Sequence, residues 1–340
     1  MRDALIQASV KPDKKSDYPV KQLELELSRL KSDRRELRDS VEEVLEAHIG
    51  SVLVDENIAL WWNFAFPPVD FRLTEPPLIL VTSPRDRIAR KHDVMLNPSV
   101  TLSQRDEIEN SLKNSWNLSA LVVEIGGVAT YPATILNTRP LNATFKTAAH
   151  EWVHHYLFFH PLGRNMFSSP EMQTLNETFA SMVGREIGSA AYQKLGLLLS
   201  QAPSKYPPRT DGASAVNKVD IEKFIFSDEM RKTRLRVDEL LMVGMIEEAE
   251  AHMEEVREKF VANGFNIRKL NQAYFAFHGT YAESPTSASP IGNQLHRLRA
   301  SKPDLKAFIG VMRQITSYKE FIETLENLER TKVAKSPILQ

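Results

Sequence analysis

The chain has 340 residues, 42% of them hydrophobic, which is enough to bury a sizeable core in one large domain or two lobes. Lys and Arg number 43 against 44 Asp and Glu, so the formal net charge is −1, and this balance gives no sign of a nucleic-acid partner. The chain contains no cysteine, which excludes disulfides, thiol catalysis and cysteine-ligated zinc.

Residues 1–17 are polar and rich in lysine, which predicts a flexible tail. The following segment, 18–60, predicts an amphipathic helix with Leu23, Leu30 and Leu37 on its apolar side. We expect this side to pack on the rest of the domain, because its heptads are not sustained long enough to favour a coiled-coil dimer.

Two features of the sequence concern location. The first residues of the chain are too poor in apolar side chains for the core of a signal peptide. No apolar run reaches the roughly 18 residues that a membrane helix needs. We therefore expect a cytoplasmic protein without a membrane span.

An aromatic cluster at 61–66 stands directly before Pro67 and Pro68. We expect its rings to pack in the core; the alternative is that they line a substrate cleft. The apolar segments 69–73 and 78–82 are bounded by prolines and predict strands.

A helix is predicted over 101–114, with Thr101 or Ser103 as the cap of its first turn. The segment 121–133 is β-rich and contains a pair of glycines. It predicts a strand just before the next helix, and one interpretation of the glycines is an ordinary bulge.

The most informative stretch runs from His150 to His154, inside an apolar segment that predicts a helix capped by Asn142 and ended by Pro161. Histidines four residues apart project from one face of a helix, so both imidazoles can bind one metal ion. Glu151 then stands beside any water that the ion holds, which is how zinc hydrolases place their general base. The alternative is a helix that carries two surface histidines by chance.

A catalytic zinc ion usually has three protein ligands and an open position for water. Glu177 is the best candidate for the third ligand, on a second helix that we expect to begin after a cap at Thr174. Ala180, Ser181 and Gly184 give this helix a face of small residues. The second helix can therefore lie close to the first and direct its glutamate at the histidines.

Three other residues compete for the third ligand position. His160 follows the second histidine by six residues, but that geometry needs a glycine at a bend where this chain has Leu157. Glu171 and Glu186 are further candidates.

The C-terminal half predicts mainly helices. The polar, proline-containing segment 201–219 predicts a linker or surface loop between the metal-binding domain, 61–200, and a helical lobe, 220–330. Within that lobe one helix is expected to run through 240–260, and 331–340 is expected to be a tail.

The motif at 150–154, followed by Asn176-Glu177-x-x-Ala180, resembles the gluzincin branch of zinc metallopeptidases. The pairing is similar to that of thermolysin-like enzymes and of bacterial predicted aminopeptidases. The likeness is clear over 120–190 and weak in the C-terminal third.

The resemblance implies that His150, His154 and Glu177 bind Zn²⁺ and that Glu151 is the general base. It also implies a fold, so we expect an α+β, predominantly α structure: a zincin-like catalytic domain with a small rim sheet and a helical C-terminal lobe. One departure stands out. Thermolysin-like enzymes have an aspartate four residues after the ligand glutamate to orient a zinc histidine, whereas this chain has Ser181, so the orienting partner stays unassigned.

The resemblance points to two further features. In the family, a strand at the rim of the sheet precedes the metal helix and pairs with extended substrate, and 121–133 has the right order and distance for it. The segment 271–281 is similar to a family segment that ends in Thr-Tyr, so Tyr281 is a candidate donor to the oxyanion, with His278 as a second donor. A packed aromatic helix is the alternative interpretation of this segment.

From these residues we expect a zinc-dependent metallopeptidase that cleaves a peptide or protein substrate with a metal-activated water and Glu151 as general base. The sequence does not choose between an endopeptidase and an aminopeptidase, because the acidic signature of well-known aminopeptidases is absent. The alternatives are a metal-dependent amidase or esterase on a non-peptide substrate and a non-catalytic zincin-like interaction protein.

Overall fold

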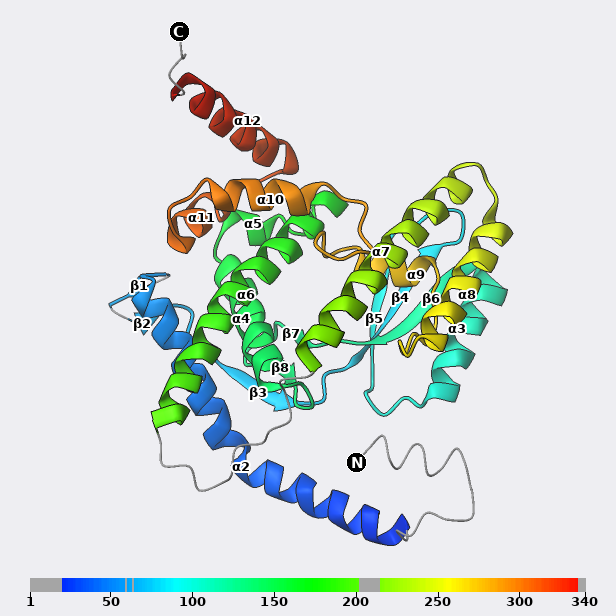
Figure 1. The fold of residues 1–340 in the computed structure, drawn as a ribbon, viewed down its shortest axis with the longest axis horizontal. Coiled ribbons are helices and arrows are strands. Elements are labelled where there is room, and N and C mark those ends of the chain that lie inside the picture. Colours follow the sequence, from blue (N-terminus) through cyan, green and yellow to red (C-terminus); the bar gives the residue numbers. More distant parts are fainter. Residues whose placement is uncertain (1–19, 59, 63, 202–214, 336–340) are drawn as a thin grey trace.

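The computed structural model describes residues 20–58, 60–62, 64–201 and 215–335 (Figure 1). Over these residues the protein is mostly helical with small sheets, which confirms the predicted predominantly α, α+β class. The predicted tail at 1–17 and most of the predicted loop at 201–219 lie outside the described residues. Among the described helices, none combines the length and the apolar character that crossing a membrane requires.

The long helix α2 (Val20–Asp55) has two halves in different environments. Its C-terminal half buries Leu45 and Leu53 in the main core. Its N-terminal half leaves Leu30 and Leu37 exposed. The apolar side of this helix therefore packs on the domain, as expected, only from Leu45 onward.

Three aromatic side chains of the 61–66 cluster have a described exposure, and they do not pack in the core as expected: Trp62, Phe64 and Phe66. The strands β1 (Leu60–Trp61) and β2 (Phe64–Ala65) form a two-stranded antiparallel hairpin. Trp62 is 85% and Phe64 76% exposed on it. The hairpin therefore presents these two rings to solvent.

A three-stranded sheet lies beside the central helices, in the order β3 (Phe71–Thr74), β8 (Ala133–Leu136), β7 (Gly127–Val128). β3 pairs parallel with β8, and β7 pairs antiparallel with β8. β3 and β7 are thus the two edges of this sheet.

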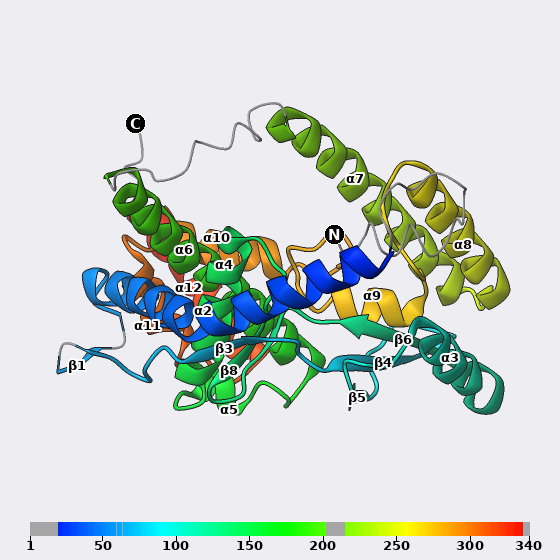
Figure 2. The same cartoon turned by 90° about the horizontal axis from the view of Figure 1, so that it is seen from below.

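The edge at β3 is covered by α2, which runs alongside it (Figure 2). Two carboxylates one helical turn apart accept hydrogen bonds from the strand: Glu46 from the Phe71 N–H at 2.9 Å and Glu42 from the Leu73 N–H at 2.5 Å. Glu42 also pairs with Arg72 at 3.0 Å. The helix therefore satisfies backbone donors that a further strand would otherwise take.

A second three-stranded sheet is antiparallel, in the order β5 (Asp93–Leu96), β4 (Leu78–Pro84), β6 (Leu118–Glu124). One face packs on α3 (Leu102–Trp116) and the other on α9 (Gln272–His278). Two apolar clusters therefore enclose this sheet.

Of the sequence-based predictions for residues 101–133, one is confirmed and one is wrong. Thr101 caps α3 with a complete capping box, as expected. The single strand expected over 121–133 is instead divided, with its first residues in β6 and its later ones in β7 and β8, which belong to the other sheet.

The central helices are α4 (Leu141–Leu157) and α6 (Pro170–Gln201), joined through the short α5 (Pro161–Arg164). Two predicted caps are wrong. Pro140, and not Asn142, precedes the first turn of α4, and Thr174 lies inside α6, which begins four residues earlier.

Glycines let α4 and α6 approach closely. A methyl group added at Gly184 would lie 2.7 Å from the backbone nitrogen of His150, and one at Gly188 would lie 2.6 Å from the backbone of Lys146. The predicted face of small residues on the second helix is therefore confirmed, since no side chain fits between the two backbones at these points.

The C-terminal half divides between two cores. α7 (Ala215–Met242) and α8 (Ile246–Ala262) form one of them with α9, and Gly244 at φ +80° interrupts what was expected to be one helix over 240–260. The later helices pack instead in the main core with α4 and α6; they are α10 (Ile291–Ala300), α11 (Leu305–Met312) and α12 (Tyr318–Lys335). The expected C-terminal lobe is thus not one unit, and α12 extends into the expected tail.

Candidate metal centre

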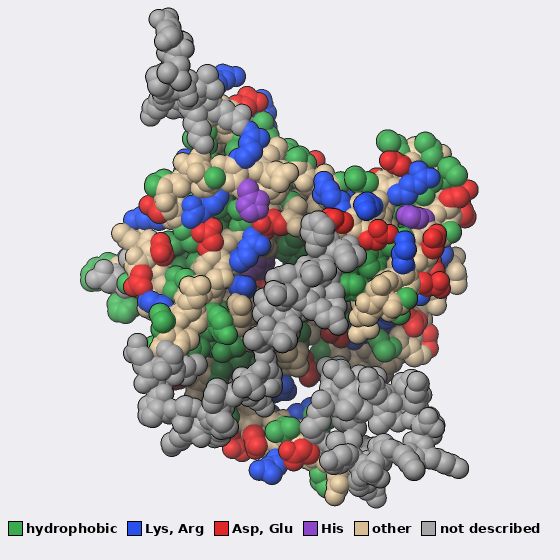
Figure 3. Space-filling view, viewed as in Figure 1, with side chains coloured by type: hydrophobic (Ala, Val, Ile, Leu, Met, Phe, Trp, Pro, Cys, Tyr) green, Lys and Arg blue, Asp and Glu red, His purple; other side chains and the backbone are tan. Residues whose placement is uncertain are grey.

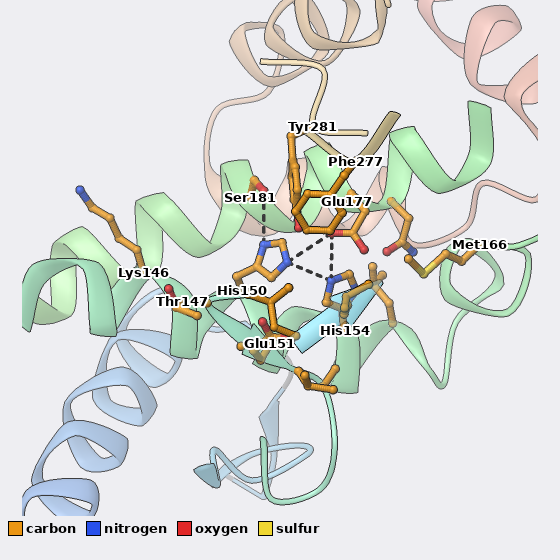
Figure 4. Close-up of a pocket in the computed structure, with 18 of the residues that line it drawn as sticks. Lys146, Thr147, His150, Glu151, His154, Met166, Glu177, Ser181, Phe277 and Tyr281 are labelled. Carbon is orange, nitrogen blue, oxygen red and sulfur yellow. Dashed lines mark hydrogen bonds and ion pairs between the residues drawn. The ribbon is translucent and has the colours of Figure 1, made fainter. Parts of the chain in front are cut away.

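Three side chains from α4 and α6 converge on one point (Figure 4). The Nε2 atoms of His150 and His154 lie 3.0 Å apart. The Oε2 atom of Glu177 lies 3.5 Å from the first nitrogen and 3.6 Å from the second. Ligand atoms bound tetrahedrally to one zinc ion at about 2.0–2.1 Å are separated by roughly 3.3 Å. The three atoms therefore have the mutual spacing that one such ion requires.

The surroundings of these groups are largely dry, with only 13–14% of each side chain exposed. Burial opposes the charge of His154, but the neighbouring charge of Glu177 outweighs it and raises the pKa of the histidine to about 9. Burial likewise opposes the charge of Glu177, yet the two histidines hold the pKa of this carboxyl well below its usual range. A carboxylate held ionised between two imidazole nitrogens is a donor set suited to a cation.

Glu151 lies on the same helix and is 6% exposed. Its carboxylate and the ligand nitrogens of the two histidines lie within 4.8 Å of one another. Gly127 of β7 is directly opposite, since a methyl group there would come within 2.6 Å of Glu151 Oε1. Burial raises the pKa of Glu151. Both glutamates are near enough to hold an ion together with the two histidines, and the distances of 3.5 and 3.6 Å place the Glu177 oxygen at ligand spacing.

The structure supplies an orienting partner that the sequence left unassigned. Ser181 Oγ lies 3.3 Å from Nδ1 of His150, which fixes the ring from behind. Asn176, next to Glu177 in the chain, is fully buried and donates from Nδ2 to the Leu162 carbonyl at 3.2 Å. Ser181 stands four residues after Glu177, on the same face of α6, and this spacing was the signal in the sequence that could have identified it.

Tyr281 reaches the same site from the segment after α9. The Ala282 N–H donates to Thr178 Oγ1 at 2.9 Å, which holds this segment on α6. The ring centroid of Tyr281 lies 6.3 Å from that of His150. The charge of Glu177 and burial raise the pKa of the Tyr281 phenol well above its usual value, so the hydroxyl keeps its proton and can donate it in a hydrogen bond.

His278 lies on the cleft wall rather than at the ligand atoms. Its ring contacts that of Tyr274 in a tilted arrangement, with centroids 4.3 Å apart. Burial lowers its pKa to about 4, so the imidazole is neutral near pH 7. Of the two predicted donors, the structure therefore brings only Tyr281 next to the histidine pair.

The competing third ligands have other contacts. The ring of His160 lies 4.4 Å from that of Tyr156, at the start of α5. Glu186 pairs with Arg299 at 2.9 Å, and Glu171 is exposed in the first turn of α6. Among these candidates Glu177 is the one whose carboxylate approaches both histidines.

The site opens into a cleft of about 790 Å³ between the central helices and the sheet that carries α9. β7 and the residues around it form one rim, and the cleft walls include Lys146 and Arg139. On the face drawn in Figure 3 basic and acidic side chains of the described residues are interspersed around the hollow between the two halves. The cleft is large enough for a short segment of peptide.

Comparison of the chain with protein-family models, with curated proteins and with solved structures finds no match. The functional argument accordingly rests on the residues of the cleft and on their geometry.

Proposed function

We propose that the protein is a zinc-dependent metallopeptidase of gluzincin type. The observation that supports this function best is the triangle of His150, His154 and Glu177 donor atoms, with a second, buried carboxylate beside it. Zinc is the ion we infer, because imidazole nitrogens with one carboxylate oxygen form a common catalytic zinc site.

In this proposal Glu151 transfers protons. A bound zinc ion would supply a water of lowered pKa and polarise the scissile carbonyl. Glu151 accepts the proton from the attacking water and passes it to the leaving amine. Its raised pKa suits this task, because a carboxyl whose pKa is nearer neutrality can both take and release a proton.

Tyr281 is the proposed donor to the oxygen of the scissile carbonyl as negative charge develops there. Its hydroxyl keeps its proton at neutral pH, for the reasons given above. The neutral His278, on the wall of the same cleft, is a second donor for substrate farther from the metal.

A peptide is the substrate that the cleft favours over a small amide or ester. β7 is an edge strand with the Glu151 side chain directly against it, so an extended chain that pairs with this edge passes over the metal ligands. Neither internal nor N-terminal cleavage is favoured by a specific contact. A metal-dependent amidase remains the second candidate, and the cytoplasmic location stays a prediction.

Two variants test the proposal. Elemental analysis should find one zinc per chain in the wild type and in Glu151→Gln, and little in His154→Ala. Glu151→Gln should lose peptide hydrolysis by several orders of magnitude, because the ligands remain and the base is gone. Wild-type activity in Glu151→Gln would contradict its role, and full metal content in His154→Ala would contradict the site. Cleavage of esters or small amides but of no member of a peptide library would favour the amidase.

A further inference from the structure

A second cavity, of about 520 Å³, adjoins the metal centre and shares His154, Phe158 and Ala129 with the main cleft. Its walls are otherwise formed mainly by aromatic and proline side chains, namely Phe66, Pro67, Pro68, Tyr131, His155 and Phe159. We propose that this cavity is a specificity pocket for a large apolar side chain, preferably aromatic, on the N-terminal side of the scissile bond. The inference rests on the proposed peptidase function and names the substrate class.

The walls of the pocket are fixed by hydrogen bonds to α4. The Trp152 indole donates to the Pro67 carbonyl at 2.8 Å and holds the proline segment on the helix. Nε2 of His155 lies 2.6 Å from the Thr130 carbonyl oxygen and holds the chain that follows β7. Both anchors are neighbours of the metal-binding histidines on the same helix. The pocket is therefore formed before substrate arrives, which limits the entropy lost on binding.

Several rings around the pocket are exposed to solvent, and a bound substrate side chain would cover part of their apolar surface. Phe158 is 72%, Tyr131 57% and Phe159 46% exposed. The centroids of the Phe66 and Phe159 rings lie 5.3 Å apart, and the two rings are tilted. The centroids of the Phe158 and Phe159 rings are also 5.3 Å apart, and these rings meet edge to face. A further ring inserted among them would gain aromatic contacts and remove apolar surface from water.

The direction of β7 decides which side of the scissile bond the pocket serves. The chain runs from Gly127 past Glu151 and reaches the pocket at Ala129 and Tyr131. An antiparallel partner is the more stable addition to an edge, so a bound peptide would run the opposite way. Its N-terminal part then lies along 129–131, beside the pocket, before the chain passes over the metal ligands.

The test uses two aromatic residues of the same segment. Phe66 lines the pocket, whereas Phe64, two residues earlier, is 76% exposed and does not line it. The substrates are pairs of peptides that differ only in carrying Phe or Ala at one position, with two positions tested on each side of the scissile bond. The wild type, Phe66→Ala and Phe64→Ala are each assayed with all of these peptides. For wild type, kcat/KM should favour Phe roughly tenfold to a hundredfold at one N-terminal position only, as burial of a benzyl group predicts. That preference should fall at least about fivefold in Phe66→Ala and stay within about twofold in Phe64→Ala.

A pocket-filling variant and a binding measurement complete the test. Ala129→Phe, at an exposed position that lines both the pocket and the main cleft, should abolish the ratio of kcat/KM for Phe over Ala at that N-terminal position, whatever the change in the overall rate. In parallel, N-acetyl-phenylalaninamide should bind the wild type more tightly than N-acetyl-alaninamide by calorimetry, and Phe66→Ala should lose that difference.

These outcomes separate two kinds of failure. If the wild type cleaves no peptide and yet shows the difference in amide binding, the peptidase proposal fails and the pocket stands. Preference on the C-terminal side, equal preference at all positions, or a preference and a binding difference unchanged by Phe66→Ala would overturn the pocket assignment.

Discussion

Two helix pairs in this protein are held together by different means. α7 and α8 meet mainly through an apolar core, with Met230, Val237, Met253 and Phe260 among its buried members. α4 and α6 meet backbone to backbone at glycines and place ionisable groups between them. The first pair is stabilised mainly by the burial of apolar side chains, with one ion pair between Glu229 and Lys259 at 3.2 Å. The second pair holds charged groups whose burial is costly unless they share an ion. The contact between the α4 and α6 backbones at these glycines therefore sets the distances between the side chains of the proposed ligands.

The largest expected effect concerns the ligands of the second pair. Glu177→Ala should lower zinc affinity by about a thousandfold or more, because it removes the oxygen that lies near both histidine nitrogens. A chelator competition titration measures it. His160→Ala is the control and should stay within a few-fold of wild type, and the opposite ranking of the two variants would assign the third ligand to His160.

In the first pair the expected effect is on stability alone. Met253 is fully buried, so Met253→Ala should reduce the free energy of unfolding by roughly 2–5 kcal/mol. Urea denaturation gives this value, and elemental analysis should find the metal content unchanged. A parallel loss of metal would show that the two pairs are not independent.

Glycines on α6 allow a matched comparison within one helix. Gly184→Ala places a methyl group 2.7 Å from backbone of α4, so it should cost about 1–3 kcal/mol of stability and weaken zinc binding by separating the helices. Gly196 has open space around its Cβ position, so Gly196→Ala should stabilise the helix by about 0.5–1 kcal/mol. Thermal unfolding with and without a chelator distinguishes them. Equal effects would mean that the close contact has no part in metal binding.

The smallest effect is expected at the support of the first histidine. Ser181→Ala removes the oxygen behind the His150 ring and should weaken zinc binding by about tenfold, with little change in stability. Ser189→Ala, two turns further along α6, is the control for a serine lost from the same helix. Identical zinc affinity in both variants would show that Ser181 does not orient the histidine.

The convergence of His150, His154 and Glu177 could be predicted because its signals are local. Histidines four apart share a helix face whatever the fold, and a glutamate beside small residues needs only one packing event to reach them. Thr101 was likewise readable, because a capping box involves residues three apart. The cap expected at Thr174 was wrong because Pro170 can begin the helix earlier and no local rule forbids it.

Features that depend on distant partners could not be predicted. The division of 121–133 between two sheets depends on β4 for one part and on β3, through β8, for the other. The exposure of Phe64 depends on where its hairpin projects from the body. Ser181 could be found only when α6 was known to lie behind the His150 ring. Composition and periodicity carry no information on such placements.

The carboxylates of α2 have a consequence for how this molecule meets other chains. Strand edges recruit extended polypeptide without regard to its identity, which promotes self-association. In the sheet next to the metal centre, Glu42 and Glu46 occupy the donors of β3, so that side offers no template to a neighbour. The remaining edge, β7, lies directly over Glu151. An unfolded chain that joins this sheet is thereby delivered to the groups proposed to cut it.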